Sequence, residues 1–259
     1  MDRNHFSIGF FDSGVGGISV LREAVKVLPR ENYIYFGDSK NAPYGTKTPE
    51  EVRRLSFNVI DKLIEMKVKA IVIACNTATS IAIDALREKY SCIPIIGIEP
   101  ALKPAVESCG AGTIVIMATP MTLAENKFSA LREKYSKTAK IIPMPCDGLV
   151  EIIEGGNTSG YIVEDYLENK FKNIPKENIS AVVLGCTHYP FIKEALVKVI
   201  NDNVAIIDGS LGTVKQLKRM LENEKLLNDS DNIGSVKILN SKNEERLIDL
   251  SYKLLEESN

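Results

Sequence analysis

Two short apolar runs, each ending in a cysteine, constrain the fold of this chain more than any other feature. Residues 71–74 read Ile-Val-Ile-Ala and precede Cys75, and residues 182–185 read Val-Val-Leu-Gly and precede Cys186. A continuous β-branched run of this length is typical of a strand buried on both faces of a parallel sheet. Ligands of open α/β sheets bind just outside the carboxyl ends of such strands. We therefore expect the two cysteines to face each other across one substrate.

The rest of the sequence alternates between strand-like and helix-like segments. Beside the two cysteine runs, strands are predicted at residues 7–11, 32–36, 93–98, 113–118, 140–143, 205–207 and 235–239. Helices are predicted at residues 18–28, 48–67, 80–90, 123–135, 149–153, 160–172, 191–200, 213–227 and 244–255. Such alternation indicates an α/β fold with parallel strands and right-handed crossovers.

The order of elements after residue 112 repeats the order of the first hundred residues. Asp12 precedes Cys75 by 63 positions, and Thr119 precedes Cys186 by 67. Any series of βα units gives similar spacings, but the matched cysteines favour an internal duplication. The sequence thus predicts two pseudo-symmetric, doubly wound, mostly parallel-sheet domains with the active site in the crevice between them. Their predicted bounds are 1–98 plus 208–259 for the first domain and 99–207 for the second, because the tail is expected to pack on the first half.

Composition excludes several classes of protein. Of the 259 residues, 44% are hydrophobic and 25% charged, and the formal net charge is −2, which is ordinary for a globular chain and unfavourable for nucleic-acid binding. No apolar run approaches the ~18 residues that a membrane span needs, and the start leads directly into a strand rather than a secretory signal. Five cysteines without close pairs indicate free thiols in a reducing cytoplasm, and two histidines are too few for a structural zinc site.

Two thiols at matched strand ends suit proton removal on one face of a carbon and proton delivery on the other. A lone cysteine on an apolar strand is more often a buried core residue. Cys75 and Cys186 differ because each ends a strand and precedes polar residues that can donate hydrogen bonds to a thiolate. The other cysteines lack one or both features and are interpreted as structural: Cys92, Cys109 and Cys146.

Further polar residues follow predicted strands. Asp12 and Ser13 come after the first strand, where they could contact a substrate or merely cap the next helix. The glycines that follow do not spell GxGxxG, so dinucleotide binding is poorly supported. His188 lies two positions after Cys186 and could tune that thiol or cap a helix.

Four motifs, FFDSGVGG, NAPYG, ACNTA and GCTHYP, occur in an order and spacing that closely resemble those of glutamate racemases. The resemblance runs from about residue 7 to residue 208, and the last two motifs carry most of its specificity. It implies interconversion of L- and D-glutamate without pyridoxal phosphate, metal or nucleotide. It also implies a cytoplasmic homodimer that supplies D-glutamate for peptidoglycan and uses neither nucleic acid nor membrane as a partner.

By this resemblance, Cys75 takes the α-proton of D-glutamate and Cys186 that of L-glutamate. Asp12 and His188 assist, and the assisting glutamate of the family falls on Glu154, with Glu151 close by as an alternative. The substrate contacts implied by the resemblance are Asp12, Ser13, Pro43, Tyr44, Gly45, Asn76, Thr77, Thr119, Thr122, Thr187 and His188.

Two other readings stay open from the residues alone. The first is a racemase for aspartate, hydantoins or another small amino acid, or a maleate-isomerase-like catalyst, on the same scaffold. The second is a non-catalytic amino-acid binding protein that closes on its ligand. The motif GCTHYP and the start Asp12-Ser13-Gly14 favour glutamate over the first, and the paired thiols count against the second.

Overall fold

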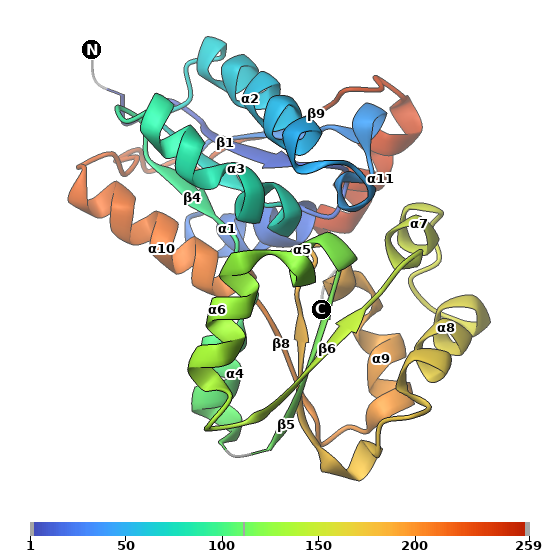
Figure 1. The fold of residues 1–259 in the computed structure, drawn as a ribbon. Helices are drawn as coiled ribbons and strands as arrows, with labels where there is room; N and C mark the ends of the chain where they lie inside the picture. The colour runs from blue at the N-terminus through green and yellow to red at the C-terminus, as the bar shows by residue number, and fades with distance from the viewer. Residues whose placement is uncertain (1–2, 111, 257–259) are drawn as a thin grey trace. The chain divides into compact units, whose positions relative to one another are not determined.

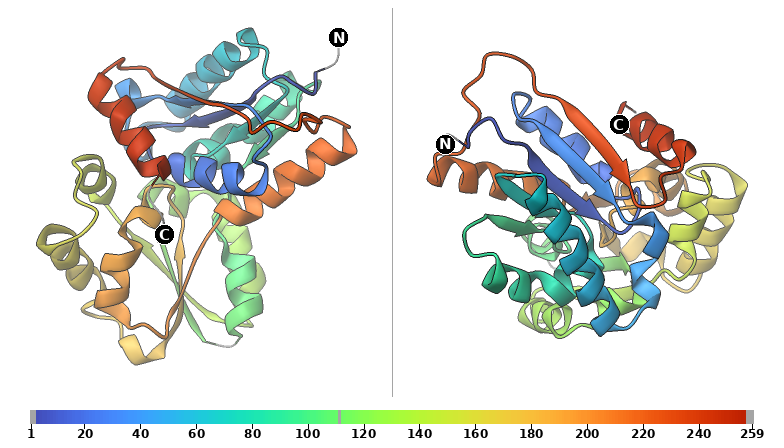
Figure 2. Two further views of the ribbon diagram at one scale, coloured as in Figure 1. Left: turned by 180° about the vertical axis from the view of Figure 1, so that it is seen from behind. Right: turned by 90° about the horizontal axis from the view of Figure 1, so that it is seen from above.

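The computed structural model describes residues 3–110 and 112–256 of a chain that divides into two compact units (Figures 1 and 2). The first unit consists of Met1–Glu99 and Ser210–Asn259, and the second of Pro100–Gly209. The first unit is therefore assembled from both ends of the chain, whereas the second is continuous in sequence.

The first unit is built on a sheet of five parallel strands in the order β4-β3-β1-β2-β9. Its strands are β1 (Ile8–Asp12), β2 (Tyr33–Gly37), β3 (Ala70–Ile73), β4 (Ile95–Gly97) and β9 (Val236–Asn240). Every residue of the neighbouring strands β1 and β3 is buried. The apolar run before Cys75 is therefore a central strand covered on both faces.

Helices lie on both faces of this sheet (Figures 1 and 2). They are α1 (Ile18–Val27), α2 (Pro49–Glu65), α3 (Asn76–Lys89), α10 (Ser210–Asn223) and α11 (Glu245–Glu256). Helix α2 packs against α3, and α1 packs against α10 and α11. The start of α2 follows from its sequence, because Thr48 and Glu51 form a capping box around Pro49 at the first helical position.

The second unit is built on four parallel strands in the order β6-β5-β7-β8. Its strands are β5 (Thr113–Ala118), β6 (Lys140–Pro145), β7 (Ile179–Leu184) and β8 (Ala205–Asp208). Alternate side chains of the central strands enter two different cores: Val115 and Val182 belong to one, and Ile114 and Val183 to the other. Both faces are therefore buried, and the α/β class predicted from the sequence is confirmed.

The helices of the second unit enclose these two cores. They are α4 (Leu102–Cys109), α5 (Pro120–Ala124), α6 (Asn126–Tyr135), α7 (Leu149–Glu154), α8 (Tyr161–Phe171) and α9 (Lys193–Ile200). Short 3₁₀ turns are η1 (Ser39–Asn41) and η2 (Tyr44–Thr46) in the first unit, and η3 (Lys176–Asn178) and η4 (Tyr189–Ile192) in the second.

The two sheets share one strand order. Within each unit, the first four strands in the chain lie as fourth, third, first, second: β4-β3-β1-β2 and β8-β7-β5-β6. Cys75 and Cys186 follow the third strand of their units, β3 and β7, each of which lies beside the first strand. This equivalence of topology supports the duplication predicted from the spacing.

Several helices differ from the prediction, and those close to the strand ends matter most. Helix α3 begins at Asn76 rather than near residue 80, because Cys75 itself caps it. The helix predicted to reach residue 135 begins at Asn126, and a separate short helix, α5, precedes it; Glu125 between them has an extended backbone. Helix α4 was not predicted, and its Pro104 is at the third helical position, where a proline needs no N–H partner.

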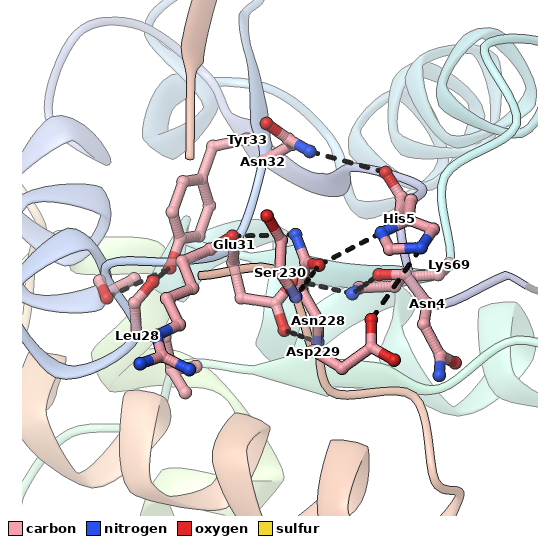
Figure 3. A network of polar contacts seen from close by, with 12 residues as sticks. Asn4, His5, Leu28, Glu31, Asn32, Tyr33, Lys69, Asn228, Asp229 and Ser230 are labelled. Atoms are coloured by element: carbon pink, nitrogen blue, oxygen red, sulfur yellow. Dashed lines mark hydrogen bonds and ion pairs between the residues drawn. The ribbon is translucent and has the colours of Figure 1, made fainter. Parts of the chain in front are cut away.

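A buried ion pair lies in the first unit where segments far apart in the sequence meet (Figure 3). Lys69 Nζ lies 2.5 Å from Glu31 Oε2, and these side chains are 0% and 2% exposed. Lys69 also donates to the carbonyl oxygen of Asn4, and Glu31 Oε1 accepts from the Asn228 N–H at 2.9 Å. The pair thus joins the N-terminal segment, the loop after α1, the start of β3 and the C-terminal segment.

Within the described residues, no helix combines the length and the apolar character needed to cross a membrane.

Candidate functional site

The first group of candidate residues lies at the carboxyl edge of the first sheet. Asp12 ends β1, Ser13 follows it, and Cys75 follows β3 directly. Because β1 and β3 are neighbours, the three side chains gather at one place and all are buried. Gly17 lets α1 approach closely, since a Cβ there would lie 2.6 Å from the Cβ of Asp12. The glycine-rich turn is therefore required by packing.

The sulfur of Cys75 is held by hydrogen bonds from both sides. It accepts from the N–H of Ala78 at 3.4 Å, and its thiol donates to Ser13 Oγ at 3.6 Å. Cys75 is thereby the N-cap of α3, a position where free N–H groups and the helix dipole favour negative charge.

Asn76 and Thr77 begin α3 and are buried beside Cys75. Within the described part of the chain, Asn76 Oδ1 is a buried oxygen without a hydrogen-bond partner. Such an oxygen is costly unless a ligand donates to it. An ammonium group is one such donor. Asp12 is already engaged in part, because its Oδ2 accepts from the Gly14 N–H at 3.0 Å.

The predicted contacts Pro43, Tyr44 and Gly45 lie on the loop between β2 and α2, in the same unit. Tyr44 is fully buried, and its ring packs edge-on against Phe11. Its hydroxyl donates to Asp38 Oδ2 at 2.7 Å. Burial, followed by the neighbouring Asp38 carboxyl, raises the pKa of Tyr44 far above its usual value, so the phenol remains a proton donor.

The second group lies at the carboxyl edge of the sheet in the second unit. Cys186 Sγ is 3.8 Å from His188 Nδ1, and His188 Nε2 is 3.1 Å from Glu154 Oε1. His188 is 2% exposed and Glu154 25% exposed. A carboxylate that accepts from Nε2–H leaves Nδ1 as the nitrogen that faces the thiol. The series of contacts from Cys186 through His188 to Glu154 can therefore move a proton to and from the sulfur.

The same geometry separates the two glutamates that the sequence left as alternatives. Glu154 ends α7 and contacts His188, whereas Glu151 lies one turn earlier on the same helix and is exposed. The structure brings only Glu154 to the histidine.

The threonine candidates of the second unit divide between the two central strands. Thr119 follows β5 and caps α5, accepting from the Thr122 N–H at 3.3 Å, and their hydroxyl oxygens are 3.0 Å apart. Thr187 follows Cys186 and is buried. Threonine hydroxyls therefore line the ends of both central strands, as Asp12 and Asn76 do in the first unit.

Sequence reasoning missed Asp38 and Tyr189. Asp38 follows β2 at the same sheet edge as Asp12, so its position at a strand end was a usable signal. Tyr189 is fully buried behind Cys186, and its hydroxyl lies 3.4 Å from the carbonyl oxygen of Cys146. No local pattern distinguishes Tyr189 from a core residue.

Cys146 belongs to the same apolar cluster as Cys186 but is chemically different. Burial, offset only in part by Lys170, raises its pKa to about 12. At pH 8, we expect a thiolate fraction of about 10⁻⁴, against roughly a quarter for an ordinary thiol. Cys146 should therefore resist iodoacetamide in the folded protein, while the exposed Cys92 reacts at least ~10³-fold faster. Mass spectrometry of labelled peptides checks this; equal labelling of both before unfolding in urea would contradict it.

Among the described residues, no group of three or more His, Cys, Asp or Glu side chains is arranged to hold a metal ion.

Comparison with known proteins places the whole chain in one family. The family model described as Asp/Glu/hydantoin racemase matches residues 12–217. A glutamate racemase of Clostridium botulinum (strain Alaska E43 / Type E3) is 59% identical over 258 residues, which cover 100% of both chains.

Solved structures agree with the sequence relatives. A glutamate racemase of Francisella tularensis, crystallised with D-glutamate, has a TM-score of 0.85 and 33% identity, covering 98% of this chain and 95% of that one. A glutamate racemase isoform of Bacillus anthracis has a TM-score of 0.88 and 29% identity, covering 98% and 96%. With the matched strand ends and their cysteines, these likenesses show that the chain belongs to the Asp/Glu/hydantoin racemase family and, within it, to the glutamate racemases.

Proposed function

We propose that this protein interconverts L- and D-glutamate, with Cys75 and Cys186 as two acid/base groups that act on opposite faces of one α-carbon. The observation that carries the proposal is the position of the two thiols, each after the third strand of a sheet with the same strand order, in a chain 59% identical over its full length to a glutamate racemase. The same resemblance gives the directions: Cys75 takes the proton of D-glutamate and Cys186 that of L-glutamate.

In the first unit, the proposed base, Cys75, and a proposed binding group, Asn76, are neighbours in sequence. The N–H of Ala78 and the start of α3 favour the thiolate of Cys75, which takes the α-proton. The buried oxygen of Asn76 accepts from the substrate ammonium, a role that matches its lack of a protein partner among the described residues. Asp12 and Ser13 complete the polar surroundings of the thiol, and Thr77 provides a further substrate contact.

In the second unit, His188 and Glu154 serve the thiol of Cys186. The imidazole accepts the thiol proton while the Glu154 carboxylate stabilises the resulting imidazolium. Cys186 is thus a thiolate before it takes the α-proton of L-glutamate, and a thiol before it donates a proton to the α-carbon in the opposite direction. Thr119, Thr122 and Thr187 are proposed to donate hydrogen bonds to substrate carboxylates.

Following pure D-glutamate by circular dichroism, in dialysed protein with no cofactor added, tests the proposal. The signal is expected to decay to zero as the racemic mixture forms, and in D2O the product should carry deuterium at Cα. Decay with D-aspartate but not D-glutamate would assign the chain to another substrate on the same scaffold. Tight binding of glutamate without decay would make it a binding protein.

Replacing His188 by Asn or Glu154 by Gln is expected to affect the two directions unequally. The kcat for L-glutamate should fall ~10²-fold and the kcat for D-glutamate much less, because these residues serve the base that acts on the L-isomer. The equilibrium constant between the enantiomers is unity, so kcat/KM must fall equally in both directions. The KM for L-glutamate must therefore fall relative to the KM for D-glutamate. Initial rates from each enantiomer measure this.

Glu151→Gln is the matched control, because Glu151 shares helix α7 with Glu154 but is exposed. It should leave both kcat values unchanged. A symmetric fall of kcat in Glu154→Gln, or a fall as large in Glu151→Gln, would count against the assigned direction.

We further propose that residues 1–98 plus 208–259 and residues 99–207 are two racemase domains that contribute one thiol each. The family resemblance also supports a cytoplasmic enzyme that acts as a homodimer and provides D-glutamate for peptidoglycan. Light scattering after size exclusion tests the dimer, for which a mass near twice 28.6 kDa is expected. Depletion of the protein in its host should be rescued by added D-glutamate.

A further inference from the structure

The loop from Asp38 to Thr48 carries two proposed substrate contacts, Tyr44 and Gly45, yet has little regular structure of its own. It contains only the two three-residue turns η1 and η2. A binding loop of this kind keeps its geometry only if other groups fix it. The hydrogen bonds around it identify these groups.

One side of the loop is fixed by the carboxylate of Asp38, which is 3% exposed. Its Oδ2 accepts from the Tyr44 hydroxyl at 2.7 Å, and its two oxygens accept from Asn41 Nδ2 at 3.1 and 3.0 Å. The N–H of Asp38 donates to the carbonyl of Asp12 at 2.9 Å. A single side chain therefore closes the loop on itself, next to the strand end that bears Asp12.

The hydroxyl proton of Tyr44 is committed to Asp38, so the donors that the loop can offer a ligand at this position are backbone N–H groups. The N–H groups of Tyr44 and Gly45 begin the turn η2 and donate to no acceptor within residues 3–110 and 112–256. Free N–H groups are suited to a carboxylate. Whether they point correctly depends on the Tyr44–Asp38 bond.

The other side of the loop is fixed by the C-terminal segment. Asn240, at the end of β9, is 4% exposed and donates from Nδ2 to Ser39 Oγ at 2.8 Å. The next residue, Ser241, accepts on Oγ from the Lys40 N–H at 2.9 Å. Parallel pairing of β9 with β2 sets Asn240 opposite Gly37, directly before the loop.

Gly37 shows how closely the segments meet. A Cβ at this position would lie 2.5 Å from the carbonyl oxygen of Gly14 and 3.2 Å from Asn240 Nδ2. The turn after β1, the start of the loop and the end of β9 are thus in contact at one point. The loop has no room to shift there without moving Asn240.

We propose that Asp38 and Asn240 are positioning residues for substrate binding, so that the C-terminal segment, some 200 positions away in sequence, belongs to the binding apparatus. Asp38 orients the backbone of Tyr44 and Gly45 through the tyrosine hydroxyl, and Asn240 anchors the start of the loop. The inference rests on the proposed racemase function, because it assigns a role to a loop of that site.

The test compares steady-state kinetics of Tyr44→Phe, Asp38→Asn and Asn240→Ala with the wild type, using each glutamate enantiomer. KM should rise at least about tenfold in each variant, because a hydrogen bond that fixes the loop is lost or, in Asp38→Asn, is made to a neutral in place of a charged acceptor. It should rise equally for both enantiomers, since the loop serves a carboxylate and not the α-proton. A variant that is merely destabilised has fewer folded molecules, which lowers the apparent kcat and leaves KM unchanged.

Matched controls exist for two of the three variants. Tyr33→Phe removes an equally buried hydroxyl from a tyrosine that also packs edge-on against a phenylalanine, but whose acceptors are the carbonyls of Ala24 and Leu28. Asn32→Ala removes an amide that accepts from Ser235 at the opposite end of β9. Both controls should retain the wild-type KM.

A double variant tests the coupling directly. Asp38→Asn and Tyr44→Phe together should raise KM no more than the larger single effect, because the first weakens and the second removes the same bond. If Asp38→Asn does not fold, Tyr44→Phe and Ser241→Ala carry the same comparison. Wild-type KM values in the folded loop variants, or equal effects in the controls, would overturn the inference while the wild type still racemises glutamate. A wild type without racemisation would instead overturn the proposed function.

Discussion

Cys75→Ala and Cys186→Ala are each expected to lower the rate of glutamate racemisation by about 10³–10⁴-fold, which would leave almost no measurable activity. Racemisation needs a group on each face of the α-carbon, one to take the proton and one to return it. Removing either sulfur leaves one face without an acid or base. The other thiol cannot compensate, because it returns the proton to the face from which it came.

The two variants should differ in isotope exchange. In D2O, Cys75→Ala keeps Cys186 and should introduce deuterium into L-glutamate without forming D-glutamate. Cys186→Ala should do the same with D-glutamate alone. Proton NMR of the recovered enantiomers measures the exchange. Exchange of both enantiomers in one variant would contradict the assignment of one thiol to each face.

Cys92→Ala is the control for these variants, because Cys92 is an exposed thiol of the first unit. It should racemise glutamate at the wild-type rate. Retention of full activity in either Cys75→Ala or Cys186→Ala would reject the two-thiol mechanism.

Lys69→Ala is expected to lower the free energy of unfolding of the first unit by about 3–5 kcal/mol. The substitution removes the cation from a pair whose side chains are 0% and 2% exposed, and leaves the Glu31 carboxylate without its charge partner (Figure 3). For a unit of ~150 residues, the loss corresponds to a fall in Tm of roughly 10 °C. Urea unfolding followed by circular dichroism measures it.

Two further variants separate burial from charge. Arg30→Ala removes a surface ion pair with Asp231 that joins the loop after α1 to the C-terminal segment, with side chains 57% and 96% exposed, so stability should change by no more than about 0.5 kcal/mol. Lys69→Met combined with Glu31→Gln removes both charges and keeps an acceptor for the Asn228 N–H. It should recover more than half of the loss; a double variant as unstable as Lys69→Ala would show that charge is not the cause.

The sequence predicted the strand ends well, because these carry the strongest local signal. A β-branched run that stops at a polar residue indicates both that the strand is buried and where its carboxyl end lies. This signal was enough to predict β3, β7 and the positions of the two cysteines at their ends. The start of α3 was missed because a cysteine is not among the usual capping residues, although the Cys75 sulfur accepts from the Ala78 N–H.

Asp38 and Asn240 could not be recognised as partners of one loop from the sequence. Both look like ordinary polar residues at strand ends, and their importance depends on the pairing of β2 with β9. That pairing joins segments about 200 positions apart, and no local sequence pattern predicts which strands will pair. Likewise, the choice between Glu151 and Glu154 depended on which one faces a histidine from another segment.

The division of the first unit between the two ends of the chain has a consequence for synthesis on the ribosome. Residues 100–209 are continuous, so the second unit can fold while the remaining chain is still being translated. Until the last fifty or so residues emerge, β2 is an uncovered edge strand open to pairing with another nascent chain. Arrival of β9 closes that edge and brings Asn240 and Ser241 to the β2–α2 loop in a single event. A chain released before β9 is made is therefore expected to aggregate more readily and to bind substrate more weakly.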